Sequence, residues 1–530
     1  MKPPAPGSSG LSTSALFSWD PPVDRPPRWL VGSTFAALSL LLFYPLHAPY
    51  LNGDQDIPTV WALFELNRGS FYPFSLYYPS GLNNALRGVY EILLAVGPWF
   101  GYHLDPQKLL ELYAKYPHQF RMLPRFMAML AGMITLFAVW RTSIRLIGRW
   151  SALFATAILG TALMFVREHH NGMWDAPASA FICVALFFCV RYVGKPTLPT
   201  FAAACAATGL ACAFRYNACF AAIGPAAAWI AAAPPHTGRA KTLALGVAAA
   251  ALGLFVAAPA VILQPHRVLD ALRRVTDMLP HMLAAQEVST SWSDLLTRGL
   301  GTPLTVLAAI GAGAALARRD RPALPLVAIV AGYGMVLYLM PLRLNRYGLP
   351  LAAPLAILAT YTLHHYLPFA LRSIIAVAIV AVGLAGVVDH LRLLATEDTR
   401  VAAARWIRAH VDDETPVFMA GSAGWLTYLQ PDAAWRPMQP NRWRPLPAIP
   451  KRVRSGIVVT SQLPLDDEIA PALGRFLERH TDLVADFAVE SRAEEREYES
   501  PYSLPFTGLD TLIRPGPHIR IWRVRPAGRD

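Results

Sequence analysis

The sequence predicts an all-α membrane protein with about eleven transmembrane helices, followed by a small soluble α/β domain. Three observations lead to this fold class. Hydrophobic residues make up 54% of the chain and charged residues 15%, whereas soluble proteins usually carry about 25% charged residues. Long apolar runs fill residues 29–390. Residues 391–530 have an ordinary mixed composition, which indicates a separate domain.

Each predicted span is an apolar run of membrane length. A helix that crosses a bilayer needs about 20 mostly apolar residues. Residues 1–28, which precede the first span, are rich in proline and are predicted to form a disordered cytoplasmic segment. The candidate spans are residues 29–50, 122–141, 150–166, 176–193, 198–214, 217–234, 242–263, 299–317, 323–341, 350–366 and 370–390.

The basic residues between the spans predict the orientation of the chain. An apolar stretch at 88–102 is short and carries Arg87 and Glu91 at its start. If it does not cross the membrane, the following basic loops all face the cytoplasm, in agreement with the positive-inside rule. Residues 51–121 then form one external loop, and 391–530 form a periplasmic domain. The basic residues of the cytoplasmic loops are Arg141, Arg145, Arg149, Arg191, Lys195, Arg239, Lys241, Arg318, Arg319, Arg321 and Arg372.

Two further segments have predictable structure. In the external loop, aromatic residues are expected to anchor interfacial helices at the membrane surface; these are Tyr72, Tyr77, Tyr78 and Trp99. In the C-terminal domain, residues 400–410 have a helical pattern, and 455–460 and 518–524 have strand patterns. Residues 434–451, with several Pro, Arg and Trp, read as a loop. The formal net charge of +12 is explained by membrane loops, so no nucleic-acid partner is expected, whereas membrane lipids are.

Carboxylates gather at the predicted external edge of the membrane. Asp54 and Asp56 follow the first span, and Asp175 begins the fourth. Ionisable groups beside membrane spans are expensive to keep there and are functional candidates for that reason. A carboxylate can accept the proton of an attacking hydroxyl. The Asp-x-Asp pair could also hold a divalent cation such as Mg²⁺ or Mn²⁺ through its oxygens.

Arginines lie at the same predicted edge. Arg215, Arg343 and Arg346 each stand at an external helix end. A guanidinium can hold a phosphate through two hydrogen bonds and stabilise its charge as it leaves. This combination suits the displacement of a lipid-linked phosphate. Four neighbouring residues are candidates to assist: His169, His170, Tyr216 and Tyr347.

Each of these residues also has a structural interpretation. The aspartates could cap helices, because Pro58 and Pro177 stand at first-turn positions. Arginines at membrane edges commonly anchor a helix end by extending to the interface. Adjacent histidines such as His169 and His170 are more often loop residues than metal ligands. The placement of all the charged groups on one face favours a functional site over these alternatives.

At these residues the chain resembles the GT-C membrane glycosyltransferases, in particular the family 39 branch of protein-mannosyltransferase-like and aminoarabinose-transferase-like proteins. That branch carries an Asp-Glu pair directly after the first span. Residues 53–55 are similar, with Asp54 at the catalytic aspartate and Gln55 in place of the glutamate. Asp56 is then a candidate for the missing carboxylate.

Four further stretches are similar to segments of the same branch. Residues 76–82 resemble its "YPSL" segment, and 167–177 resemble its second acidic loop, with Asp175 at the motif aspartate. Residues 209–217 resemble its "GLA…KYN" turn, with Arg215 in place of lysine. Residues 345–350 resemble its "RYLLP" segment, which includes Arg346 and Tyr347.

The resemblance covers residues 30–520 and implies an activity. It implies a sugar donor linked to polyprenyl phosphate, and inverting transfer on the external face of the bacterial inner membrane. The acceptor could be a lipid, a glycan or a protein. Two alternatives remain: a flippase or transporter of lipid or polysaccharide, or a non-catalytic envelope-assembly protein. A transporter usually places charges at mid-membrane and repeats its helices, and neither feature is evident in this sequence.

Overall fold

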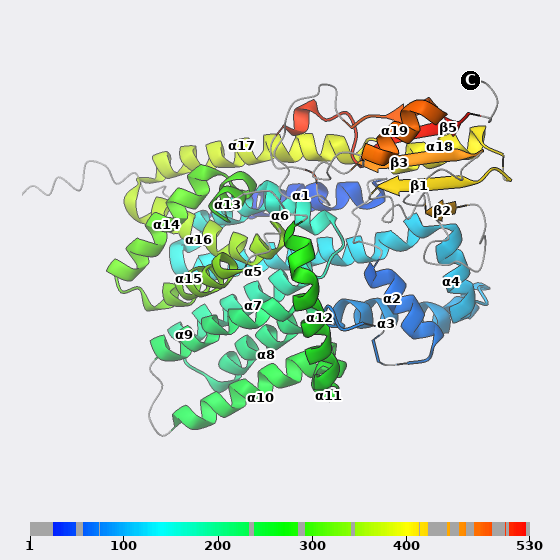
Figure 1. Cartoon of the computed structure of the whole chain (residues 1–530). Coiled ribbons are helices and arrows are strands. Elements are labelled where there is room, and N and C mark those ends of the chain that lie inside the picture. Colours follow the sequence, from blue (N-terminus) through cyan, green and yellow to red (C-terminus); the bar gives the residue numbers. More distant parts are fainter. Residues whose placement is uncertain are drawn as a thin grey trace, which may run out of the picture.

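The described part of the chain contains a large helical domain and a small α/β domain at its C-terminal end (Figure 1). The structure is a computed structural model. It describes residues 25–48, 57–70, 72–73, 75–232, 238–284, 292–340, 345–412, 414–421, 443–445, 455–462, 471–489, 504 and 508–525. Most of the predicted N-terminal segment therefore lies outside the described residues, as do Asp54, Asp56 and Arg343.

The long apolar runs form helices throughout the first domain, because straight-chain and small apolar residues favour helix and a lipid environment requires internal backbone hydrogen bonds. The helices of this domain are α1 (Arg28–Phe43), α2 (Ile57–Asn67), α3 (Gly81–Val96), α4 (Pro106–Lys115), α5 (Pro117–Gly160), α6 (Leu163–His170), α7 (Asp175–Gly194), α8 (Leu198–Phe214), α9 (Ile223–Ala232), α10 (Arg239–Ala257), α11 (Pro259–Leu263), α12 (Pro265–Ala284), α13 (Trp292–Leu300), α14 (Thr302–Ala317), α15 (Leu324–Leu339), α16 (Leu349–Tyr366) and α17 (Phe369–Leu394). Short 3₁₀ helices connect them at η2 (Tyr44–His47), η3 (Gly97–Phe100), η4 (Tyr216–Ala222), η6 (Arg321–Ala323) and η7 (Asn345–Gly348).

The prediction of a helical membrane protein is confirmed. Within the described residues, six helices are long and apolar enough to cross a membrane, and three shorter apolar helices accompany them. Each of the eleven predicted ranges overlaps one of the helices given above. The number of helices that cross a membrane stays a prediction. The six long helical stretches are Arg28–His47, Gln119–Gly160, Asp175–Gly194, Arg239–Ala257, Arg321–Leu339 and Phe369–His410.

Two predicted spans meet within α5. Gly148 interrupts this helix with φ 77° and ψ 175°, a backbone conformation open to glycine and strained for other residues. The chain therefore turns at Gly148, between the ranges 122–141 and 150–166. This turn accounts for a single stretch of 44 residues, which is about twice the length that one crossing requires.

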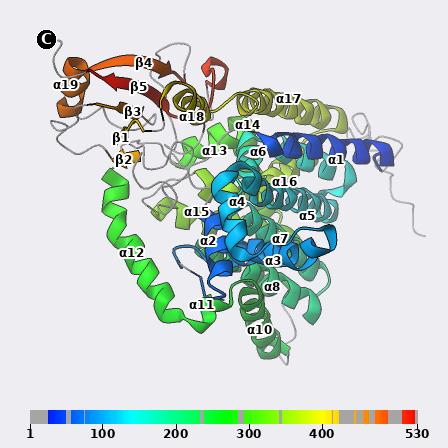
Figure 2. The same ribbon diagram turned by 90° about the vertical axis from the view of Figure 1, so that its right-hand side faces the viewer.

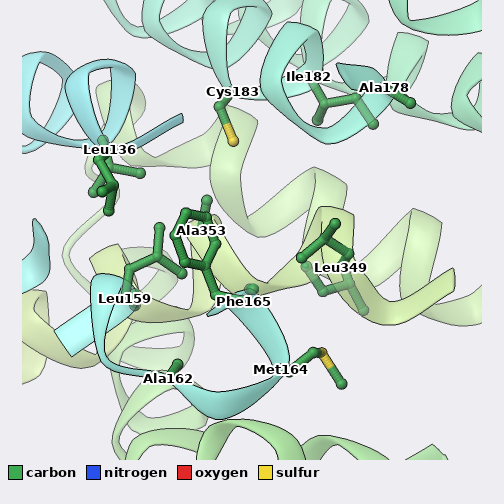
Figure 3. Close-up of a cluster of buried hydrophobic side chains, with 14 of the residues drawn as sticks. Leu136, Leu159, Ala162, Met164, Phe165, Ala178, Ile182, Cys183, Leu349 and Ala353 are labelled. Carbon is green, nitrogen blue, oxygen red and sulfur yellow. The ribbon is translucent and has the colours of Figure 1, made fainter. Parts of the chain in front are cut away.

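The core of the helical domain surrounds α16. Nearly every side chain of α16 is buried, and this helix packs against α5, α7, α14 and α15. Figure 3 shows part of the cluster, where Leu136, Phe165, Ile182 and Leu349 come together from α5, α6, α7 and α16. In contrast, α17 exposes much of its apolar surface, which is expected of a helix that faces lipid.

The two ends of the helix bundle carry different charged groups. At one end, Arg145 interacts electrostatically with Arg141 and Arg191. Arg318 and Arg372 lie near His365 and His364, respectively, at the last turn of α16. The carboxylate of Asp175 and the guanidinium of Arg215 lie together at the other end of the bundle, where α7 begins and α8 ends. This distribution supports the predicted orientation, which remains a prediction.

Three short helices lie on the predicted external side. Figure 1 shows α2, α3 and α4 at the right-hand end of the bundle, the end that also carries the C-terminal sheet. The helix α3 and the 3₁₀ helix η3 together contain most of the apolar stretch at 88–102, and Trp99 in η3 is highly exposed. The helices α11 and α12 run along one flank of the bundle (Figure 2).

The C-terminal domain is a five-stranded mixed sheet with two helices. The strand order is β2-β1-β3-β5-β4, with β1 parallel to β2 and β3, and β5 antiparallel to β3 and β4. The prediction of a small α/β unit is confirmed. The predicted loop at 434–451 is wrong at its centre, where β2 forms because it pairs with β1. The elements are α18 (Thr399–His410), β1 (Val417–Gly421), β2 (Trp443–Pro445), β3 (Ile457–Gln462), α19 (Pro471–His480), β4 (Thr481–Phe487), η10 (Leu509–Thr511) and β5 (His518–Val524).

A return segment of the C-terminal domain packs against the helical domain. Leu509 and Leu512 belong to the same buried cluster as α6 and α17. The guanidinium of Arg167 on α6 donates a hydrogen bond to the backbone carbonyl of Leu504. The two domains are therefore joined beside the turn that leads to Asp175, and not by the covalent linker alone.

The orientation can be tested by reporter fusions. Fusions at Asn52 and at Asp398 should both report an external location, because an odd number of spans separates the cytoplasmic N-terminus from each. A fusion at Lys195 should report the cytoplasm and serves as the control. If Asn52 and Asp398 report opposite sides, the stretch at 88–102 crosses the membrane and the predicted orientation is wrong.

Candidate functional site

Asp175 and Arg215 form a buried ion pair. Asp175 is the first residue of α7, and Arg215 directly follows the last residue of α8. These helices are antiparallel neighbours joined by a short turn, so the start of one and the end of the other meet at the same end of the bundle. Arg215 Nε lies 2.9 Å from Asp175 Oδ1, and both side chains are 5% exposed.

The ion pair leaves hydrogen-bonding capacity unused. The N–H of Arg215 Nε is not directed at the carboxylate oxygen, so the contact is electrostatic rather than a formed hydrogen bond. Arg215 Nη2 and Asp175 Oδ2 are also buried, with no hydrogen-bond partner among the described residues. Buried polar atoms without partners are costly, and they are common where a ligand completes the site. The snorkelling and capping interpretations explain neither the burial nor the pairing.

Aromatic rings surround the guanidinium of Arg215. Its Cζ lies 4.9 Å from the ring centroid of Tyr78 and 4.9 Å from that of Tyr347. Tyr78 in turn stacks on Trp174 with a centroid distance of 4.4 Å, and Trp61 lies 6.0 Å from Trp174. This continuous row of π groups orients the guanidinium and excludes water from it, which strengthens its interaction with an anion.

Two other predicted residues lie close to this row. Tyr216 OH donates a hydrogen bond of 3.0 Å to the carbonyl of Leu76 and so holds the segment that carries Tyr78. Arg346 on η7 lies close enough to Arg215 for electrostatic repulsion between the two guanidinium groups. An anion that binds between or beside two guanidinium groups offsets the repulsion between them.

The turn before Asp175 is held by buried polar contacts. Glu168 accepts hydrogen bonds from Arg167, and its other oxygen accepts one of 3.2 Å from Asn171 Nδ2. Gly172 adopts φ +65°, and a Cβ there would lie 3.1 Å from the backbone nitrogen of Arg125. The turn thus packs directly on the start of α5.

His169 and His170 are not loop residues. Both lie in the last turn of α6 and are buried, and His170 Nδ1 lies 3.3 Å from His390 Nε2 on α17. Burial lowers the pKa of His169 to about 4 and that of His170 to about 3, so both rings are neutral near pH 7. A direct charge interaction between these rings and a phosphate is therefore not expected.

Asp54 and Asp56 lie outside the described residues, but both flanks of their segment contact the site. Arg125 Nη1 donates a hydrogen bond of 2.6 Å to the carbonyl of Ala48, the last residue described before the segment. The segment ends at α2, whose Trp61 contacts Trp174, the neighbour of Asp175. Arg343 also lies outside the described residues, in the stretch that precedes η7.

Several residues of the site could not be assigned from the sequence. The sequence predicted only an anchor role for Tyr78, whereas its ring stacks on Trp174 and lies against Arg215. Trp61, Trp174 and Arg125 carried no signal beyond their proximity to acidic motifs. The position of Trp174 directly before Asp175 was the one feature that could have singled it out.

The described residues do not by themselves fit a divalent metal. Within them, no group of three or more His, Cys, Asp or Glu side chains is placed to hold an ion. The carboxylate of Asp175 is already neutralised by Arg215. A metal site would therefore depend on Asp54 and Asp56, which lie outside the described residues.

Comparisons with known proteins point to one fold. Residues 120–263, which include Asp175 and Arg215, match the family described as dolichyl-phosphate-mannose-protein mannosyltransferase. A comparison with curated protein sequences found no match. The chain is similar to the crystal structure of ArnT from Cupriavidus metallidurans bound to undecaprenyl phosphate, with a TM-score of 0.53 and 15% identity, over 93% of this chain and 98% of that one.

Two other solved structures agree with this similarity. The apo structure of the same ArnT has a TM-score of 0.50 and 17% identity, over 82% of this chain and 93% of that chain. The archaeal oligosaccharyltransferase AglB from Archaeoglobus fulgidus, in complex with an inhibitory peptide and a dolichol-phosphate, has a TM-score of 0.50 and 11% identity, over 82% of this chain and 69% of that chain. At these identities the similarity shows a shared fold.

Proposed function

We propose that this chain, which has the fold of the GT-C membrane glycosyltransferases, transfers a sugar from a polyprenyl-phosphate-linked donor to an envelope acceptor. The acceptor is a lipid, a glycan or a protein with a free hydroxyl group. Transfer takes place on the external face and inverts the configuration of the anomeric carbon. The buried Asp175–Arg215 pair, with its unused hydrogen-bonding atoms, is the observation that carries this proposal.

Arg215 is proposed to bind the donor phosphate. Its Nη2 is buried without a partner among the described residues, so a phosphate oxygen can complete its hydrogen bonding. Asp175 is proposed to hold the guanidinium in place and to offset its charge before the donor binds. Arg346 and Arg343 are proposed to add positive charge from the segment that ends at η7. Tyr347 and Tyr216 then position Arg215 and its neighbouring loop.

Asp54 is proposed as the general base. In an inverting transfer, the acceptor oxygen attacks the anomeric carbon, and its proton passes to the carboxylate of Asp54. The bond between the anomeric carbon and the phosphate oxygen breaks, and its electron pair leaves with the polyprenyl phosphate. The carrier phosphate departs as an anion that arginine stabilises, so no general acid is required.

Two local contacts support the placement of Asp54 near this site. Arg125 holds the segment at Ala48, and Trp61 holds its other end beside Trp174. The described residues on either side of the segment therefore contact residues near Asp175, which supports the proposal that Asp54 acts on an acceptor bound there. Asp56 is the candidate to support Asp54, either by a hydrogen bond or through a shared Mg²⁺ or Mn²⁺ ion.

The transfer can be measured in vesicles that contain the purified full chain. A donor library of polyprenyl-phosphate sugars and an envelope lipid and glycan extract are added together. We expect free polyprenyl phosphate to appear only when both donor and acceptor are present. Comparison of envelope glycans from strains with and without the gene identifies the sugar and the acceptor. Movement of the intact donor across the bilayer without its cleavage would contradict transfer and support a flippase.

A further inference from the structure

A groove opens on the lipid-facing side of the helical domain. It has a volume of about 430 Å³, within the usual range of about 300–1,000 Å³ for small-molecule sites. The end of α5 and the start of α6 form its floor at Ala162 and Leu163, the α13–α14 junction forms one wall, and α17 forms the other. This groove does not share any lining residue with the Asp175–Arg215 site.

The groove is apolar except at one place. Arg298, at the end of α13, is the single charged residue among those that line it. Along α17 the lining runs from Ile375 to Gly386, which at 1.5 Å per residue is about 16 Å, or about half the thickness of a bilayer's hydrocarbon core. The groove therefore has the length of one leaflet and an apolar lining that contains one cationic residue.

Two glycines of α17 show how closely this helix approaches the floor of the groove. Gly386 faces Leu163, and a Cβ there would still lie 3.7 Å from the nearest Leu163 atom. At Gly383, in contrast, a Cβ would lie 2.5 Å from the carbonyl oxygen of Thr161, so α17 is in close contact with the end of α5 there. The helix α17 therefore packs tightly on the floor at Gly383 and less tightly at Gly386.

We propose that this groove binds an acyl chain of an anionic glycerophospholipid from the surrounding bilayer, with the lipid phosphate at Arg298. The occupant is argued from charge and position. Residues of α17 beside the groove, such as Val377 and Val388, expose apolar surface, so bilayer hydrocarbon is what this face meets. A guanidinium in the lining of an apolar groove favours a lipid with a phosphate and a net negative charge.

Lipid binding here would support the neighbouring site. Leu296 of α13 lies against η7, where a Cβ on Gly348 would be 3.6 Å from the Leu296 side chain. Tyr347, next to Gly348, packs against Arg215. A lipid that fills the groove therefore supports the wall that lies between it and the phosphate-binding arginine. The inference depends on a membrane location and not on the proposed transferase activity.

The first test fills the groove. The full chain is purified in mild detergent as wild type, Ala378→Phe and Val377→Phe, and bound lipids are counted by native mass spectrometry. Ala378 lines the groove, whereas Val377 is its neighbour on the exposed side of α17 and is the matched control. We expect one bound anionic phospholipid on the wild type and on the control. The amount of bound lipid should be about tenfold lower on Ala378→Phe, because the phenyl ring takes the space of the acyl chain.

The second test removes the charge. In nanodiscs with equal amounts of phosphatidylglycerol and phosphatidylcholine, Arg298→Gln should lose about fivefold of the preference for the anionic lipid. Gly386→Leu is a second groove-filling variant in case Ala378→Phe does not fold. Equal lipid retention in every folded variant overturns the proposal. So does equal retention of neutral lipid by the wild type, or a bound lipid that carries the transferred sugar, since that lipid would be the acceptor.

Discussion

Replacement of Asp54 by Asn is expected to slow sugar transfer by about 10²–10⁴-fold, the usual effect of losing a general base. The amide keeps the shape of the side chain but cannot accept the acceptor's proton. Donor binding should change little, because Arg215 and not Asp54 is proposed to hold the donor phosphate. The measurement is the initial rate of transfer with saturating donor and acceptor, together with the donor KM.

The matched control is Asp105→Asn. Asp105 also belongs to the predicted external loop, where it caps α4 through a hydrogen bond to Lys108 N that an amide oxygen can also accept. Asp105→Asn should leave the rate of sugar transfer unchanged. Normal turnover by a well-folded Asp54→Asn variant would rule out Asp54 as the base. Loss of activity in Asp56→Asn that Mn²⁺ or Mg²⁺ partly restores would indicate a metal bound by this pair.

Arg215→Ala is expected to lower the transfer rate by about 10²–10³-fold, which is typical for the loss of one donor to a developing anion. Arg215→Lys should keep part of the activity, because lysine supplies charge without the planar fork. Truncation also leaves the Asp175 carboxylate buried without its partner, which costs about 3–5 kcal/mol of stability in comparable pairs. Thermal unfolding must therefore be measured beside the rate.

The lysine variant separates a loss of phosphate binding from a loss of folding. It retains a positive charge beside Asp175, so the fold should be less affected than in Arg215→Ala. The donor KM should nevertheless rise, because one of the two phosphate contacts is lost. Arg273→Lys is the matched control, since Arg273 is exposed on α12. If Arg215→Lys has the same rate and donor KM as the wild type, Arg215 acts as a helix anchor.

The helical part of the fold could be predicted because a bilayer imposes one local rule. Every spanning segment must be long, apolar and helical, so hydropathy alone located residues 176–193 and 198–214, which are α7 and α8. The small C-terminal sheet follows no such rule. The strands β3 and β5 stood out by their apolar residues, but β2 depends on pairing with β1, which lies more than twenty residues earlier.

The sequence could predict which charged residues belong to the candidate site, but not how their side chains contact one another. The chain order placed Asp175 and Arg215 at the same edge, and the structure brings them into contact. The stacking of Tyr78 on Trp174 joins residues from two separate loops, and His170 meets His390 across 220 positions. Such contacts are set by how α3, α6 and α17 pack, which no local pattern in the sequence reports.

The bond between Arg167 and the carbonyl of Leu504 has a consequence for biosynthesis. These two residues are 337 positions apart, and a ribosome adds about 5–20 residues per second, so tens of seconds separate their synthesis. During that interval α6 is already made, but the last contact that holds its polar turn has not yet formed. The acidic turn before Asp175 is therefore completed only after the C-terminal domain has been synthesised and has folded back onto α6. A chain that stops before Leu504 should insert normally and yet be recognised by membrane proteases as unfinished.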